Sequence, residues 1–178
     1  MLSNYLISLF IHSKYRVMNT NMVNREKYSI LTPVILMSKL EKVLISLTPL
    51  GDLMLRCWVA NAFWVSGLTK IQSWDSTLYL FENEYAVPLL PPDIAATVGT
   101  AVELCGPVLL AFGLCGRSTA ALLFLFNIVA VISYPDLGAT GIEQHKVWGI
   151  MLLVCVLHGP GKWSLDTLIK RRFFPAAH

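Results

Sequence analysis

Four long apolar stretches constrain the fold of this chain more than any other feature of its sequence. They cover residues 51–71, 94–112, 118–134 and 142–158, and each approaches the ~20 residues that an α-helix needs to cross a bilayer. Of the 178 residues, 55% are hydrophobic and only 14% are charged, whereas soluble domains carry about 25% charged residues. The sequence therefore predicts an all-α integral membrane protein with a four-helix transmembrane bundle over residues 51–160.

The positions of the basic residues predict the orientation of the bundle, because Lys and Arg concentrate in cytoplasmic loops. They gather before the first apolar stretch, between the second and third, and after the fourth, while the other two loops are mainly acidic. The basic set is Lys14, Arg16, Arg25, Lys27, Lys39, Lys42, Arg117, Lys162, Lys170, Arg171 and Arg172. We therefore expect both termini in the cytoplasm. Because these residues do not line one face, we expect no nucleic-acid partner.

Short interfacial helices are expected at both ends of the bundle. Residues 37–50 alternate apolar and charged side chains at helical spacing, which predicts an amphipathic helix on the membrane surface. The tripeptide Pro49-Leu50-Gly51 is then expected to turn the chain into the first span. Residues 161–178 predict a cytoplasmic interfacial tail, in which Ser164 caps a second amphipathic helix.

Residues 1–36 are expected to form a separate N-terminal extension. They lack the basic start and the small-residue cleavage site of a signal peptide. We interpret them as a mobile segment or as residues that precede a natural translation start at Met22 or Met37.

Glu103 is a carboxylate within an otherwise almost uncharged stretch. A charge at that depth costs about 3 kcal/mol or more unless it is paired or hydrated. Arg56 of the first span should lie within about 6 Å of it in depth, so we expect an Arg56–Glu103 ion pair. Two interpretations stay open: the pair is a clamp between helices, or it lines a site for a ligand or for protons.

Two histidines bracket the fourth apolar stretch. His145 and His158 are roughly 20 Å apart along a helix, so they cannot bind one metal ion or one haem. Each is either an ordinary interfacial residue or a proton donor to a quinone.

Further candidate residues lie within or beside the spans. Asn61 and Asn127 are expected either to hold helices together or to contact a ligand. Trp64 and Trp148 belong either to an interfacial aromatic belt or to a stacking site for a quinone ring.

The cysteines indicate no cofactor of the chain's own. Cys57, Cys105, Cys115 and Cys155 lie in or beside apolar stretches and form no C-x-x-C motif, so we expect small buried hydrophobic side chains, with a metal or redox pair as the less favoured alternative. No dinucleotide, haem or iron–sulfur motif is visible, and we expect no metal site.

Several strings together resemble the DoxX family of small four-helix bacterial inner-membrane proteins. They are L-M-L-R-C-W-V-A-N-A-F-W-V-S-G-L-T-K-I at residues 53–71, G-T-A-V-E-L-C-G-P at 99–107, H-K-V-W-G-I-M-L-L-V-C-V-L-H at 145–158 and G-P-G-K-W-S-L-D at 159–166. The last string is the most specific. The resemblance covers about residues 50–170 and implies a location in the bacterial inner membrane.

The resemblance also implies redox chemistry at the membrane. One branch of the family looks like a subunit of thiosulfate:quinone oxidoreductase, and another is associated with complexes that handle thiols. This implies a membrane subunit that couples a thiol or thiosulfate donor to quinone, with Glu103, Arg56, His145 and His158 at the site and an oxidoreductase partner supplying electrons.

Two other functions stay open. The chain could be a non-catalytic anchor or assembly module for a soluble oxidoreductase. A small-molecule carrier is less favoured because no internal repeat is visible. A homo-oligomer is compatible with all three functions.

Overall fold

The computed structural model describes the backbone of residues 2–174 and the side chains of residue 14 and residues 35–174. The chain divides into two compact units, Met1–Leu47 and Thr48–His178. The first unit lies within helix α1 (Leu2–Gln72). The structure does not test the prediction that residues 1–36 are mobile or precede a natural start at Met22 or Met37, and it stays a prediction.

Helix α1 contradicts one expectation about the entry into the membrane. It remains helical through Pro49, Leu50 and Gly51, so the predicted turn at this tripeptide is wrong. A proline inside a helix removes one backbone hydrogen bond, and membrane helices tolerate this because neighbouring groups satisfy the freed carbonyl.

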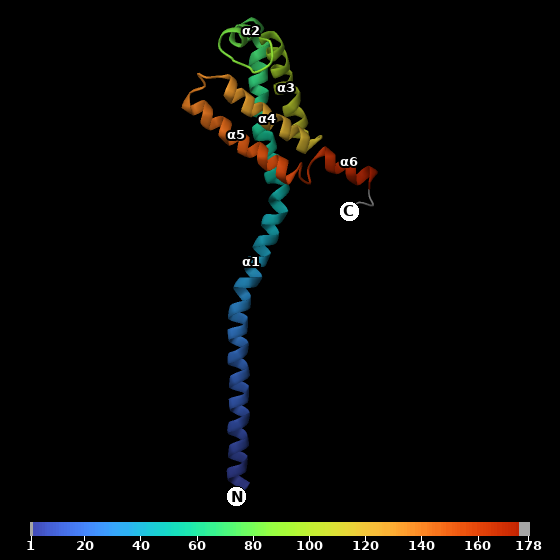
Figure 1. Cartoon of the computed structure of the whole chain (residues 1–178). Coiled ribbons are helices and arrows are strands. Elements are labelled where there is room, and N and C mark those ends of the chain that lie inside the picture. Colours follow the sequence, from blue (N-terminus) through green and yellow to red (C-terminus); the bar gives the residue numbers. More distant parts are fainter. Residues whose placement is uncertain (1, 175–178) are drawn as a thin grey trace. The chain divides into compact units, whose positions relative to one another are not determined.

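The second unit is a bundle of helices, and the all-α prediction is confirmed (Figure 1). After α1 follow α2 (Trp74–Asn83), α3 (Pro92–Phe112), α4 (Gly116–Ser133), α5 (Gly138–His158) and α6 (Leu165–Phe173). Within the described residues, three helical segments are long and apolar enough to cross a membrane: Ile35–Gln72, α3 and α4. Helix α5 is also 21 residues long, but the polar run at residues 143–146 lowers its hydropathy.

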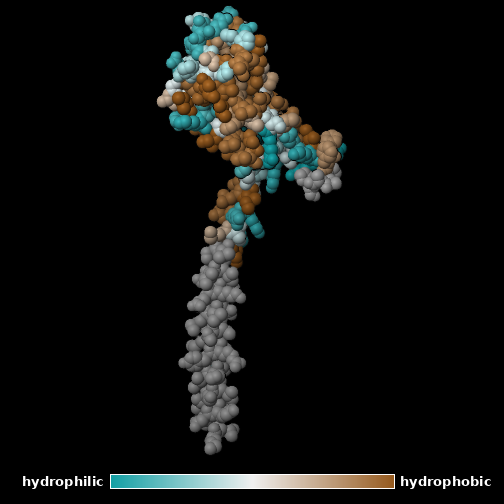
Figure 2. All heavy atoms as spheres, viewed as in Figure 1, coloured by the Kyte–Doolittle hydropathy of each residue, from teal (hydrophilic) through white to brown (hydrophobic). Residues whose placement is uncertain are grey.

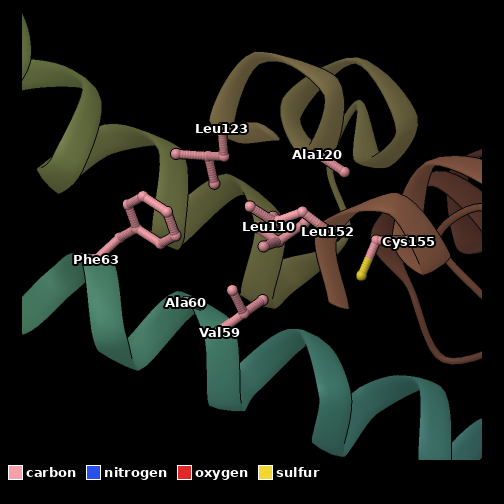
Figure 3. Close-up of a cluster of buried hydrophobic side chains, with 8 residues drawn as sticks. All are labelled: Val59, Ala60, Phe63, Leu110, Ala120, Leu123, Leu152 and Cys155. Atoms are coloured by element: carbon pink, nitrogen blue, oxygen red, sulfur yellow. The ribbon is translucent and has the colours of Figure 1, made fainter. Parts of the chain in front are cut away.

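The four longest helices meet in one apolar core (Figure 3). Its buried members are Val59, Ala60 and Phe63 from α1, Leu110 from α3, Ala120 and Leu123 from α4, and Leu152 and Cys155 from α5. Glycines allow the helices to approach closely. A Cβ on Gly67 would lie 2.9 Å from the Leu104 side chain, and one on Gly106 would lie 2.8 Å from Leu123.

The outer surface of this bundle is apolar in the way that a lipid-facing surface must be. Brown side chains cover much of the bundle in Figure 2, with hydrophilic side chains around α2 and near α6. Large exposed residues on the spanning helices include Val65, Val98, Leu109, Leu122, Leu125 and Ile128. Soluble proteins do not expose so much contiguous apolar surface, so the chain is a multi-pass membrane protein.

Helix α2 was not expected from the sequence, which suggested only a loop between the first two spans. Phe81 of α2 packs against Ala95 and Ala96 of α3 in a second, smaller core. The two alanines leave room for the phenylalanine ring. This packing places α2 and the loop after it over one end of the bundle.

Candidate functional site

Glu103 is paired within the bundle, but its partner is Lys70. Lys70 Nζ donates to Glu103 Oε2 at 2.6 Å, and Ser66 Oγ donates to Glu103 Oε1 at 3.2 Å. Lys70 also donates to Ser66 Oγ at 3.0 Å. Since Ser66 and Lys70 are four residues apart, they share one face of α1 and bind α3 together.

The predicted Arg56–Glu103 pair is therefore wrong. The sequence interpretation counted Lys70 with the loop after the first span, although it lies at the end of the apolar stretch 51–71. In the structure α1 continues to Gln72, and the long lysine side chain reaches back along the helix. The i, i+4 spacing of Ser66 and Lys70 is the sequence signal that could have indicated Lys70 as the partner of Glu103.

The ion pair lies on the wall of a cavity of about 320 Å³. Residues from α1, α2, α3, α4 and α5 line it, together with the two loops at this end of the bundle. Ligand sites for small molecules begin at about 300 Å³ and are mostly apolar with a few polar groups. This cavity has both properties.

Aromatic rings close one side of the cavity. Phe81 and Tyr85 pack edge to face with centroids 4.9 Å apart, and Tyr85 packs against Tyr134 in the same manner at 4.8 Å. Backbone N–H of Ala86 donates to Ser133 O at 2.8 Å, which ties the loop after α2 to the end of α4. Flat ligands pack well against such rings.

Two hydroxyl groups on the cavity lining are suited to donate hydrogen bonds. Burial raises the pKa of the Tyr85 phenol, and Tyr134, Glu84 and Glu103 raise it further, so Tyr85 stays protonated at neutral pH. Ser133 Oγ is the one buried side-chain polar atom without a hydrogen-bond partner among the described residues. Buried polar groups are almost always paired, so this hydroxyl is free to donate to a molecule that enters the cavity.

His145 also lines the cavity and is held by Asn127. His145 Nδ1 lies 2.8 Å from Asn127 Oδ1, and Asn127 Nδ2 donates to His145 O at 2.9 Å. Because the amide oxygen accepts from the ring, Nδ1 carries the proton and Nε2 is left as the acceptor. Asn127 thus joins α4 to α5, which confirms its predicted role between helices.

The other predicted site residues lie outside the cavity. Asn61 and Trp64 are exposed on α1. Trp148 packs against His145 and Phe63 with ring centroids 4.9 and 6.1 Å apart. These three positions contribute no lining to the cavity.

The cysteines are free, and Cys155 alone among them is buried. The expectation of four buried thiols is therefore wrong for Cys57, Cys105 and Cys115, which are exposed. Within the described part of the chain, no three His, Cys, Asp or Glu side chains come together as metal ligands.

Arg56 lies at the other end of the bundle and is fully buried, with 1% of its surface exposed. Its Nη2 donates to Trp163 O at 2.6 Å, its Nη1 to Leu110 O at 3.5 Å, and its Nε to Asp52 O at 3.4 Å. The carbonyl end of α3 carries partial negative charge, which stabilises the guanidinium. Arg56 therefore fastens α1 to α3 and to the segment before α6.

Residues 159–166 also hold the helices together at this end of the bundle. We call Arg56 and residues 159–166 together the C-terminal clasp. Asp166 accepts from the backbone N–H of Cys115 at 2.9 Å and of Gly116 at 2.8 Å, which caps the start of α4 from a distant segment. Ser164 Oγ accepts from Thr167 N at 3.2 Å. The predicted cap of α6 by Ser164 is confirmed.

His158 lies beside the clasp and is exposed. Its Nδ1 is 4.0 Å from Asp52 Oδ1. The two predicted proton donors are therefore at opposite ends of α5, and His145 alone lies near Glu103.

Asp166→Ala is expected to lower the free energy of unfolding by about 1–2 kcal/mol, because two N–H groups at the start of α4 lose their acceptor. Thermal unfolding of the detergent-solubilised protein measures this effect. The matched control is Asp136→Ala, which removes an exposed carboxylate. Equal melting temperatures for the two variants would contradict the capping role.

The chain is similar to one protein family and to bacterial proteins from two species. The family described as DoxX matches residues 51–135. An uncharacterized protein of Haemophilus influenzae is 35% identical over 128 residues, which cover 67% of this chain and 83% of the relative. A protein of Bacillus subtilis named putative oxidoreductase CatD is 36% identical over 84 residues, which cover 47% of this chain and 59% of that protein. No solved structure matches.

Proposed function

This chain belongs to the DoxX family, and from that premise we propose that it is the membrane subunit of a redox complex whose cavity beside Glu103 binds the headgroup of a quinone. The observation that carries the proposal is the buried Lys70–Glu103 pair on the wall of an aromatic-lined cavity. The name of the Bacillus relative, a putative oxidoreductase, supports the redox class.

The cavity lining suits the chemistry of a quinone headgroup. A quinone ring is flat and apolar, and its two carbonyl oxygens accept hydrogen bonds. Phe81, Tyr85 and Tyr134 provide ring contacts, while the Ser133 hydroxyl and the Lys70 ammonium provide donors. A charged donor makes the stronger bond.

Reduction of a quinone to a quinol takes up two electrons and two protons. A partner that oxidises two thiols to one disulfide releases two electrons and two protons, so the exchange balances. With thiosulfate as donor, two thiosulfates joined as tetrathionate release two electrons, and the two protons come from water. Lys70, Glu103 and His145 are the titratable side chains on the cavity lining that could relay protons. The role of this chain would be to bind and orient the quinone while the partner supplies electrons.

A substitution that fills the cavity tests whether quinone binds there. Ala130→Phe places a ring in the cavity, and we expect it to weaken binding of a short-chain quinone by at least about tenfold, or about 1.4 kcal/mol. Quenching of intrinsic fluorescence in nanodiscs measures the affinity. Leu125→Phe, on the exposed side of α4, is the matched control and should change the affinity by less than about twofold.

Ser133→Ala separates ligand binding from folding in the same assay. No protein group loses a hydrogen bond in this variant, so its melting temperature should not fall. Loss of one donor should weaken quinone binding about three- to tenfold. Unchanged affinity in both Ala130→Phe and Ser133→Ala would refute the quinone site.

A non-catalytic anchor for a soluble oxidoreductase is the second candidate, and the exposed basic helix α6 favours it. The two functions differ in their dependence on Glu103. In membranes that contain the native partner, Glu103→Gln should abolish thiol- or thiosulfate-dependent quinone reduction if the cavity works as proposed. If the Glu103→Gln protein still bound its partner and the complex kept its full activity, the anchor function would be favoured.

A further inference from the structure

A second hollow lies at the end of the bundle that holds the C-terminal clasp. It has a volume of about 1030 Å³ and is lined by the α1 segment around Asp52, the start of α4, the end of α5 and helix α6. Helix α3, with 21 residues, is about 31 Å long, which matches the hydrocarbon thickness of a bilayer. Since α3 ends and α4 begins beside this hollow, it lies at the level of the lipid headgroups.

The hollow carries an excess of positive charge. Its cationic side chains are Arg117, Lys162, Lys170 and Arg171, and its carboxylates are Asp52 and Asp166. Both Asp166 oxygens accept bonds from the backbone of α4.

None of the four cations has a carboxylate partner in the described part of the chain. The ion pairs there join Lys70 to Glu103, Lys146 to Glu143, and His158 to Asp52. The Arg117 guanidinium donates to a carbonyl rather than to a carboxylate, with Nη2 3.4 Å from Leu157 O. Four cations around one hollow without neutralising partners favour an anionic ligand.

Helix α6 also exposes apolar side chains, on the side of the helix that does not line the hollow. Its first turn and middle expose Leu165, Leu168 and Ile169 beside the cationic Lys170 and Arg171. Amphipathic helices of this kind lie in the interface, with apolar side chains at the boundary of the acyl chains and basic ones at the headgroups. A helix placed in this way keeps the hollow at the membrane surface, where anionic lipid headgroups are concentrated.

We propose that this hollow binds the headgroup of one anionic phospholipid, with its phosphate among Arg117, Lys170 and Arg171 and its acyl chains in the adjoining bilayer. The site is separate from the quinone cavity and does not depend on the proposed redox function. It would hold a particular lipid at the clasp, in addition to the general attraction of basic residues to an anionic membrane surface.

The proposal is tested with the purified full-length chain in a neutral detergent. Short-chain phosphatidylglycerol is titrated and its retention is followed by native mass spectrometry, with phosphatidylcholine of the same chain length as the zwitterionic comparison. We expect phosphatidylglycerol to bind at least about tenfold more tightly, because two or more basic residues contribute near the phosphate.

Two neighbouring arginines provide a matched pair of variants. Arg171 lines the hollow and Arg172 does not, yet Arg171→Gln and Arg172→Gln remove the same charge from the same exposed helix. Arg171→Gln should weaken phosphatidylglycerol binding about fivefold, the effect of one basic residue near an anionic surface. Arg172→Gln should change it by less than about twofold.

Three results would overturn the proposal. Equal losses in the two arginine variants would indicate a general charge effect. Equal affinity for phosphatidylglycerol and phosphatidylcholine would exclude recognition of the anionic headgroup. Displacement of the lipid by glycerol phosphate at equal concentration would indicate a site for free anions.

Discussion

Lys70→Met is expected to lower the free energy of unfolding by about 3–5 kcal/mol, because it leaves the Glu103 carboxylate buried without a cation. Both side chains are mostly buried, with 17% and 8% of their surfaces exposed. Chemical unfolding of the detergent-solubilised protein measures the change. The same substitution should weaken quinone binding at least about tenfold, since a charged donor is lost from the cavity.

The chain contains a matched control for this ion pair. Lys146 and Glu143 have the same 2.6 Å separation, but 61% and 68% of their side-chain surfaces are exposed. Exposed pairs of this kind contribute little, so Lys146→Met should leave stability nearly unchanged. If Lys70→Met behaved like Lys146→Met, the buried pair would have no special role.

A double variant separates the structural from the functional role of the pair. Lys70→Met with Glu103→Leu replaces both charges with apolar groups, which often restores or exceeds the original stability. We expect the double variant to fold well and still to bind quinone weakly. Full quinone affinity in a stable double variant would show that the pair is only a clamp between helices.

Arg56→Met is expected to cost about 3 kcal/mol or more of stability and to release the C-terminal clasp. Three hydrogen bonds from the guanidinium are lost, and a hydrogen bond to a charged group contributes about 1.5–3 kcal/mol. The Leu110 carbonyl keeps its bond from Gly113 N, whereas the Trp163 carbonyl loses its donor. Hydrogen exchange should report faster exchange at residues 159–173, since that segment depends on Arg56 for its attachment to α1.

Two comparisons make the Arg56 prediction specific. Arg56→Lys keeps the charge but cannot reproduce the planar fork of donors, so an intermediate loss is expected. Quinone binding should survive both Arg56 variants in the folded protein, because Arg56 does not line the cavity. Unchanged exchange at residues 159–173 in Arg56→Met would contradict the role of Arg56 in the clasp.

The sequence was informative about the spans and the local cap. Apolar stretches at 94–112 and 118–134 match α3 and α4 closely, because helix length in a bilayer is set by its thickness. The Ser164 cap was also predictable, since its partner Thr167 is three residues away. Both features depend on neighbouring residues in the chain.

The partners of the buried charges were not predictable from the sequence. Arg56 and Lys70 are fourteen positions apart on α1, or about four turns, so they occupy similar faces of the helix and either could have met Glu103. The choice depends on how α1 packs against α3, where Gly67 permits close approach. The cap of α4 by Asp166 joins residues about fifty positions apart, and no local pattern reveals it.

The choice of acceptors for Arg56 makes this one joint of the bundle insensitive to acidity. An arginine stays cationic at all cellular pH values, and peptide carbonyls do not titrate. The joint between α1, α3 and the segment before α6 therefore keeps its strength when protons become abundant, whereas a joint made with a carboxylate would weaken. Protonation of Glu103 would therefore leave the attachment of α1 by Arg56 unchanged, whereas the Asp166 cap at that end would respond to acid.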